Sequence, residues 1–152
     1  MKMMEINRYA PLVAQKQVFI EAPPEIVWNI QTDINNWSRW QPGITESKLE
    51  SPLAIGSIFR WKSGGLNVTS TIQVIEPSHE IGWTGRSLGA HAKHIWKLTP
   101  QKNGTLVTTE ESMEGWSIQF LKLISPKFLD NALDTWLQSL KTKAEKETTK
   151  PN

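Results

Sequence analysis

The sequence contains no cysteine. Disulfide bonds, thiolate nucleophiles and cysteine-based zinc sites are therefore excluded. The absence fits a reducing compartment, so we expect a cytoplasmic protein. Histidine is scarce as well, because His79, His91 and His94 are the only three and no H-E-x-x-H pattern occurs. We therefore expect no metal site, and nothing in the sequence predicts a cofactor.

Long hydrophobic runs are also missing. No stretch of about 18 apolar residues occurs, so we expect no integral membrane segment, and residues 1–8 do not resemble a secretory signal. The sequence has neither a glycine-rich phosphate loop nor a G-x-S-x-G motif for a serine nucleophile. Its charge is nearly balanced, with 17 Lys and Arg against 15 Asp and Glu, which does not predict nucleic-acid binding.

Tryptophan, in contrast, is abundant: the chain has eight tryptophans and one tyrosine. Each indole brings a large apolar surface and one N–H group that needs an acceptor when it is buried. So many indoles in a chain of 152 residues indicate either a dense aromatic core or a cavity lined by aromatic rings.

The hydrophobic pattern predicts one strand and short helices, then a run of strands, then a long helix. The expected strands cover residues 12–22, 44–50, 56–62, 66–75, 81–85, 92–98 and 105–112. The expected helical segments are 24–32, a short turn around Trp37 and Trp40, a turn at 117–124, and a final helix of about 20 residues that begins at Ser125-Pro126. Strands grouped together between terminal helices are typical of a single soluble α+β domain, here over residues 1–152.

Several segments resemble the START-like superfamily, also called SRPBCC, which includes polyketide cyclase/dehydrase-like proteins. They are VFIEAPPEIVW at 18–28, Asp33, NWSRW at 36–40, GSIFRW at 56–61, EP at 76–77, IGW at 81–83 and GTLVT at 104–108. The resemblance covers a core of about residues 12–146. It implies a helix-grip fold, in which a curved antiparallel sheet of about seven strands wraps around a long C-terminal helix, with two short helices after the first strand. It also implies a deep hydrophobic cavity under that helix.

Side-chain alternation assigns one set of residues to the concave face of this sheet. The set comprises Phe59, Trp61, Val68, Ser70, Ile72, Trp83, His94 and Trp96, and the last helix adds Phe128, Leu129, Ala132, Leu133 and Trp136. These side chains are candidate ligand-binding residues, although each apolar member could equally serve as plain core packing.

Three polar residues are candidates for catalysis. His94 lies on an otherwise apolar face, where it could donate to a ligand, act as acid or base, or form a hydrogen-bonded part of the core. Glu110 and Glu111 are adjacent in a strand, so one of them points toward the concave face. Alternation does not decide which one it is. An inward carboxyl near His94 would form an acid/base pair, whereas a rim salt bridge is the plainer alternative.

These features leave three functions open. The first is a carrier or sensor that binds a small hydrophobic molecule, of lipid, polyketide or aromatic type. The second is an enzyme, a cyclase/dehydratase-like lyase that uses His94 with Glu110 or Glu111. The third is a protein-interaction module such as a chaperone co-activator, which would need an exposed apolar patch, and no run in the sequence demands one. A lipid-transfer variant of the first function would need apolar residues at the pocket mouth, for which Leu53, Ile55 and Leu66 are candidates. The sequence sets neither the ligand nor the oligomeric state.

Overall fold

The computed structural model describes residues 4–149, which form one seven-stranded antiparallel sheet and four helical segments. The strands are β1 (Leu12–Ile20), β2 (Ile44–Leu49), β3 (Ile58–Ser63), β4 (Leu66–Glu76), β5 (Glu80–Ser87), β6 (Ala90–Gln101) and β7 (Gly104–Glu114). The helical segments are α1 (Pro24–Thr32), the 3-10 helix η1 (Ile34–Arg39), α2 (Trp116–Ile124) and α3 (Phe128–Thr149). The strand order is β1-β7-β6-β5-β4-β3-β2.

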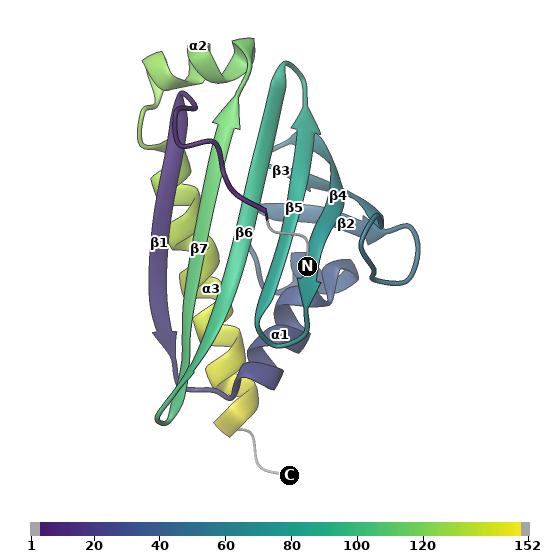
Figure 1. Ribbon diagram of the computed structural model, residues 1–152, viewed down its shortest axis with the longest axis vertical. Helices are drawn as coiled ribbons and strands as arrows, with labels where there is room; N and C mark the ends of the chain where they lie inside the picture. Colours follow the sequence, from purple (N-terminus) through teal and green to yellow (C-terminus); the bar gives the residue numbers. More distant parts are fainter. Residues whose placement is uncertain (1–3, 150–152) are drawn as a thin grey trace.

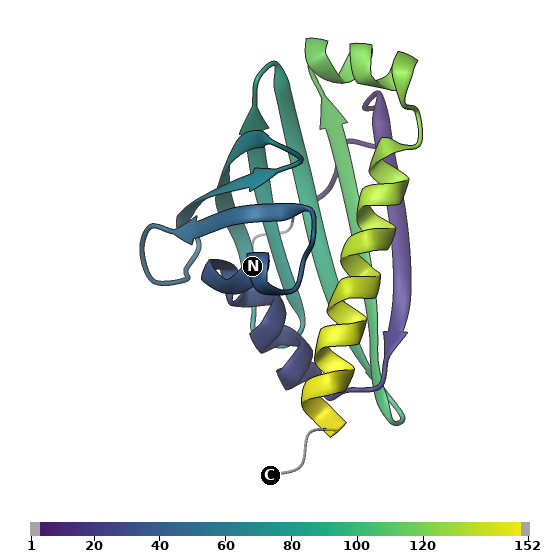
Figure 2. The same cartoon turned by 180° about the vertical axis from the view of Figure 1, so that it is seen from behind.

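Helix α3 lies across one face of the sheet, with α1 at one end of the grip and α2 at the other (Figures 1 and 2). The sheet curls because its ladder is irregular between Ile44 and Glu46 and again between Ile72 and Val74, and such bulges bend and twist a strand. The predicted α+β helix-grip architecture is therefore confirmed.

Helix α1 starts and ends where its residue types favour it. Pro24 occupies the first turn, where its missing N–H group is not needed, and Val27 and Ile30 follow at helical spacing and are buried. The helix ends before Asp33, and η1 begins at once. The indole of Trp37 in η1 donates to the Gln31 carbonyl of α1 at 2.9 Å, so the two segments are tied together.

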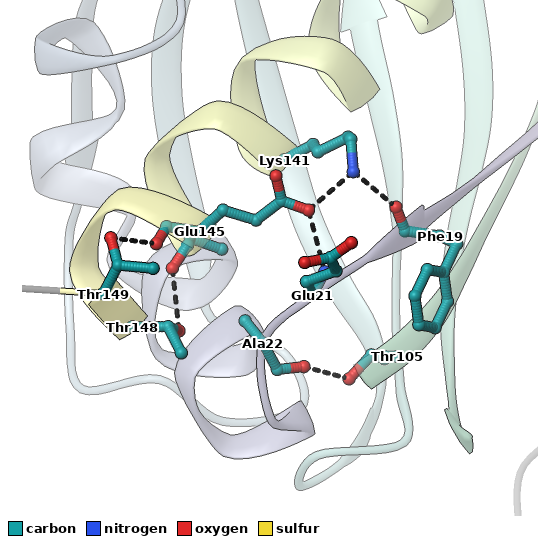
Figure 3. A network of polar contacts seen from close by, with 9 residues as sticks. Phe19, Glu21, Ala22, Thr105, Lys141, Glu145, Thr148 and Thr149 are labelled. Atoms are coloured by element: carbon teal, nitrogen blue, oxygen red, sulfur yellow. Dashed lines mark hydrogen bonds and ion pairs between the residues drawn. The ribbon is translucent and has the colours of Figure 1, made fainter. Parts of the chain in front are cut away.

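Helix α3 is fastened to the first strand by a small polar network (Figure 3). The Lys141 ammonium donates to the Phe19 carbonyl at 2.9 Å, and the Glu145 carboxylate accepts from the Glu21 backbone N–H at 2.8 Å. Partial burial alone would raise the pKa of Glu145, but the Glu21 hydrogen bond and the Lys141 charge outweigh it and lower that pKa. The network fixes the position of α3 along β1.

The convex face of the sheet is partly covered by the segment before β1. Met4 lies over Gly82, whose missing side chain makes room for it, and the Asn7 backbone N–H donates to the Ser112 hydroxyl at 2.9 Å. Ile95, which faces outward from β6, is buried. The convex side of the sheet is thus covered only in part.

Several predicted boundaries are corrected by one to three residues. The last helix begins at Phe128 and not at Pro126. Ser125 instead closes α2, because its N–H group donates to the Leu121 carbonyl at 2.7 Å. In the third strand, Gly56 has a φ of +91° and cannot continue the strand, so β3 starts at Ile58. No helix within residues 4–149 is long and apolar enough to cross a membrane.

Candidate functional site

Strands β6 and β7 bring His94 and Glu111 face to face on the concave side. The two residues are direct partners in the antiparallel register, and His94 Nδ1 lies 3.4 Å from Glu111 Oε1. Glu110 points to the other side of the sheet, where its carboxylate lies 3.6 Å from the Arg8 guanidinium. The register therefore answers the question that alternation alone left open, because the inward carboxyl is Glu111.

Thr109 sets the protonation of His94. The Thr109 hydroxyl donates to the Ile95 carbonyl at 3.1 Å, so its oxygen accepts from His94 Nε2–H at 2.8 Å. This network assigns the Nε2–H tautomer and leaves Nδ1 without a proton, facing Glu111. Burial lowers the pKa of His94 to about 3, so the imidazole is neutral at neutral pH.

Glu111 is a carboxylic acid rather than a carboxylate at neutral pH. Burial raises its pKa to about 8, because an ionised carboxyl at this position would lose the water that stabilises its charge. The 3.4 Å separation from His94 Nδ1 is longer than a good hydrogen bond. The side chain of Glu111 also remains 14% exposed. Its O–H group is therefore a donor that an entering molecule can use.

Aromatic rings fill the concave side between His94 and η1. The His94 ring lies 5.1 Å from the rings of Trp83 and Trp96, and 5.5 Å from that of Trp136. Trp136 in turn contacts Trp37 at 5.2 Å, and all of these side chains are buried. This end of the grip is a solid aromatic core.

Two buried donors in this core, Gln31 Nε2 and Trp96 Nε1, have no acceptor among residues 4–149. Both groups belong to residues that touch Trp136: its indole donates to Gln31 Oε1 at 3.2 Å, and its ring lies 5.2 Å from the Trp96 ring. Buried donors in proteins are normally paired. An oxygen from a water molecule or from a bound molecule would satisfy them.

Toward α2 the concave face changes character. Six of its side chains are only partly buried, and we call them the half-buried strip: Trp61, Val68, Ala92, Glu111, Met113 and Ala132. Two members of the strip adjoin Gly85, at which an added Cβ would lie 3.5 Å from Val68 Cγ1 and 3.9 Å from the Ala92 Cβ. Gly85 and Ala92 on the sheet are small, and so is the half-buried Ala132 on α3.

The predicted ligand-binding residues divide into three groups. Nine are buried, namely Phe59, Ser70, Ile72, Trp83, His94, Trp96, Leu129, Leu133 and Trp136. Trp61, Val68 and Ala132 belong to the half-buried strip. Phe128 differs from the prediction, since its side chain is 42% exposed at the start of α3. Gly85, Thr109 and Met113 were not predicted, because only the strand register shows that they lie beside the predicted residues.

Two hollows lie within residues 4–149. One, of about 350 Å³, opens mainly on the convex side, where Thr84, Lys93 and Ser112 line it, and it reaches the strip only at Ala92 and the adjoining Gly85. The other, of about 280 Å³, is a polar recess between α1, η1 and the end of α3. No group of three or more metal-ligating side chains occurs in the described part of the chain.

Comparisons with known proteins agree with this geometry. The model of the family described as polyketide cyclase / dehydrase and lipid transport matches residues 12–145. No curated protein matches the chain.

Solved structures match over nearly the whole chain. Hypothetical protein jhp0584 from Helicobacter pylori has a TM-score of 0.79 at 16% identity, with 95% of this chain and 99% of that chain covered. The ZhuI aromatase/cyclase from Streptomyces sp. R1128 has a TM-score of 0.79 at 12% identity, with 89% and 94% covered. A START superfamily protein from Mycobacterium smegmatis has a TM-score of 0.74 at 15% identity, with 90% and 99% covered. At these identities the likeness establishes the fold.

Proposed function

The chain belongs to the polyketide cyclase / dehydrase and lipid transport family, and we propose that it binds a small hydrophobic molecule with at least one hydrogen-bond acceptor, as a carrier or sensor. The ligand lies along the half-buried strip, between the sheet and α3. Apart from Glu111, the side chains of the strip are apolar and only partly covered, and they are small at Ala92 and Ala132. A mostly apolar surface with one polar group is the usual chemistry of a small-molecule site.

The observation that carries this proposal is the place of the Glu111 carboxyl, which lies on the concave face 3.4 Å from His94 Nδ1 with its side chain only 14% exposed. An ionised carboxylate inside an apolar site would disfavour a neutral ligand, whereas a protonated one donates a hydrogen bond. Burial keeps the proton on Glu111 up to about pH 8. The donor therefore suits a carbonyl, ether or hydroxyl oxygen on an otherwise apolar molecule.

The surrounding rings indicate a planar ligand. Trp61 is partly exposed, its indole is held by a hydrogen bond to Ser70 at 3.0 Å, and its ring lies 5.7 Å from that of Trp136. Fixed indoles offer flat surfaces on which an aromatic or polycyclic molecule can stack. The two unpaired donors, Gln31 Nε2 and Trp96 Nε1, would favour further acceptor oxygens if the ligand reaches deeper.

A second candidate function is a dehydratase-like lyase, favoured by the contact between His94 and Glu111. His94 Nδ1 would take the proton from the carbon next to a substrate carbonyl, and Glu111 would protonate the departing hydroxyl as water. The carbon–carbon double bond would form as the carbon–oxygen bond breaks. We place this role second, because burial lowers the pKa of His94 to about 3 and makes it a weak base.

The test is a fluorescence titration of the purified protein with flavonoids, quinones, sterols and fatty acids, following the tryptophan emission. We expect saturable binding to at least one class. Ala132→Phe should weaken it at least about tenfold by filling the strip, whereas Thr135→Phe, on the exposed side of α3, should not.

Glu111 provides the sharper comparison. Glu111→Met removes the donor and should weaken binding by about tenfold, while Glu110→Met on the convex side should leave it unchanged. Wild-type affinity should fall as the pH rises past about 8 and Glu111 ionises. Glu111→Gln keeps a donor and should bind without that pH dependence.

Absence of binding to every class, or full affinity in both Ala132→Phe and Glu111→Met, would overturn the proposal. Loss of water from a β-hydroxy ketone, seen by mass spectrometry and abolished in Glu111→Gln, would put the lyase first.

A further inference from the structure

Helix α2 exposes an apolar face to solvent. Trp116, Phe120, Leu123 and Ile124 recur at steps of three and four residues, so they share one side of the helix, and their exposed fractions lie between 62% and 82%. The opposite side is anchored by Ile118, which is buried. A helix with apolar residues on two sides is unusual at a protein surface, where the outer side is normally polar.

The exposed face continues onto neighbouring segments. Leu88, in the turn between β5 and β6, is exposed beside Trp116, and Phe128 follows at the start of α3. The turn and the helix touch closely, because an added Cβ at Gly89 would lie 2.2 Å from the Trp116 ring. The Ser117 backbone N–H also donates to the Gly89 carbonyl at 3.2 Å. These six apolar side chains, which we call the α2 patch, comprise Leu88, Trp116, Phe120, Leu123, Ile124 and Phe128.

The α2 patch has no role in the packed core of the chain. The core under α2 is made by Ile118 with Leu12, Ala14, Leu129 and Leu133. Contiguous exposed apolar surface of this kind marks a binding face in soluble and peripheral proteins. No run in the sequence demanded such a face, because the sequence shows the residues but not the side on which α2 packs.

The charged side chains along the α2 patch, within residues 115–129, are all positive. Lys122 and Lys127 lie within it, and no Asp or Glu occurs between Glu114 and Asp130. Neither lysine has an ion-pair partner in the described part of the chain. The two flanking acids have other partners: Glu114 accepts from the Asn7 amide at 2.7 Å, and Asp130 lies 3.6 Å from Lys16. A partner with negative charge spread over an apolar layer would complement this face.

We propose that the α2 patch docks the protein onto the surface of an anionic lipid bilayer. A short amphipathic helix with Trp, Phe and Leu on one side and lysines beside them lies in the plane of the interface, where the rings reach the acyl boundary and the lysines meet lipid phosphates. Helix α2 has nine residues and so is too short to span a bilayer. Docking is therefore peripheral and reversible.

Docking in this way would orient the candidate site. Strand β7 runs directly from Glu111 through Met113 to Gly115 and α2, and both views show α2 at the end of the sheet (Figures 1 and 2). If the half-buried strip binds a hydrophobic molecule, which is the proposed function, that molecule could pass between bilayer and strip without crossing water. The docking itself does not depend on that function.

The experiment is co-sedimentation of the full chain with two kinds of vesicle. One is phosphatidylcholine alone, and the other is an equal-part mixture of phosphatidylcholine and phosphatidylglycerol. We expect binding to the mixed vesicles at least about tenfold tighter than to phosphatidylcholine, and weaker at high salt. Phe120→Ser combined with Leu123→Ser should reduce binding at least tenfold. Lys122→Glu combined with Lys127→Glu should remove the preference for phosphatidylglycerol.

Matched controls lie elsewhere on the surface. Ile55→Ser changes an exposed apolar residue in the loop between β2 and β3, which the sequence offered as an alternative lipid-facing position, and Lys102→Glu changes an exposed lysine in the turn between β6 and β7. Both should sediment like the wild type, and circular dichroism checks that every variant is folded. No binding to either vesicle, or equal binding by the Phe120→Ser/Leu123→Ser variant, would overturn the proposal. A concentration-dependent dimer lost in that variant, without vesicle binding, would assign the face to a second copy of this chain instead.

Discussion

Glu110 and Glu111 are adjacent in β7, yet the fold gives their carboxyl groups different chemistry. Because side chains alternate along a strand, Glu110 reaches the convex side and pairs with Arg8 at 3.6 Å. Glu111 reaches the concave side, where burial raises its pKa to about 8. One neighbour therefore serves as half of an ion pair and the other as a neutral hydrogen-bond donor.

Trp136 provides a test of the aromatic core. It is buried, its ring lies 5.2 Å from those of Trp37 and Trp96, and its indole donates to Gln31 at 3.2 Å. Trp136→Ala would leave a large cavity and an unpaired amide oxygen. We expect the free energy of unfolding, measured with urea, to fall by about 3–5 kcal/mol.

The matched control is Trp116→Ala, which changes the same residue type on an exposed helix face. There we expect a loss of less than about 1 kcal/mol, because little buried surface is removed. A loss of under about 1 kcal/mol for Trp136→Ala would mean that its ring lines open space, and that this end of the grip is a cavity rather than a core.

Among the elements, those defined by local sequence were the predictable ones. Helix α1 has the predicted bounds, since Pro24 and the spacing of Val27 and Ile30 determine them locally. The start of α3 was misplaced, because Ser125-Pro126 resembles a helix start in sequence but serves as the end of α2 in the structure. Local signals cannot separate two helices that follow each other so closely.

The candidate site was predictable only in part, for a related reason. Alternation placed His94 on the concave face, but the choice between Glu110 and Glu111 depended on the register between β6 and β7. Whether tryptophans line a cavity or fill it depends on volumes brought together by the whole sheet. The exposure of Phe120 likewise depends on which side of α2 packs against Leu12 and Leu129.

The link between α3 and β1 is testable at the scale of the helix. Glu145 accepts from the Glu21 backbone N–H at 2.8 Å and pairs with Lys141, which in turn holds the Phe19 carbonyl. Glu145→Ala should lower the free energy of unfolding by about 1 kcal/mol, because it removes a charge-assisted bond between helix and strand. Urea denaturation at neutral pH measures this change.

Glu147→Ala is the control, since Glu147 pairs only with Lys143 one turn away on the same helix, at 3.0 Å. Exposed pairs of that kind contribute about 0.3–0.5 kcal/mol. The pKa of Glu145 is lowered in the folded chain. Its contribution is therefore present above the ordinary carboxyl pKa and is lost as the pH falls through the lowered one. Equal losses in the two variants would show that the network does not fasten α3 to the sheet.

The whole molecule has two unlike ends. Near η1, the tryptophans and Phe59 pack into a solid core, whereas near α2 the concave side is only partly covered and the outer side of the helix is apolar. Stability and the proposed binding thus belong to different ends of one sheet. His94 and Glu111 lie where the two ends meet, so their protonation should affect the stability of the entire fold.

The effect of pH on stability follows from the two shifted pKa values. For Glu111 the pKa rises from 4.5 to about 8 on folding, so the folded chain keeps a proton that the unfolded chain releases, and stability falls as the pH rises between these values. For His94 the pKa falls from 6.5 to about 3, so stability falls as the pH drops between these values. The two slopes oppose each other from pH 4.5 to 6.5, which predicts a plateau there.

Above pH 6.5, only Glu111 of these two groups still changes the stability with pH. From pH 6.5 to 8 the wild-type free energy of unfolding should fall by about 2 kcal/mol, at roughly 1.4 kcal/mol per pH unit. Glu111→Gln cannot ionise and should stay level over this range, while Glu110→Gln should keep the wild-type slope. Urea denaturation of the three proteins at several pH values measures these slopes. Parallel profiles for wild type and Glu111→Gln would mean that Glu111 is already ionised in the folded chain. The site would then have no neutral carboxyl to donate a hydrogen bond to the proposed ligand.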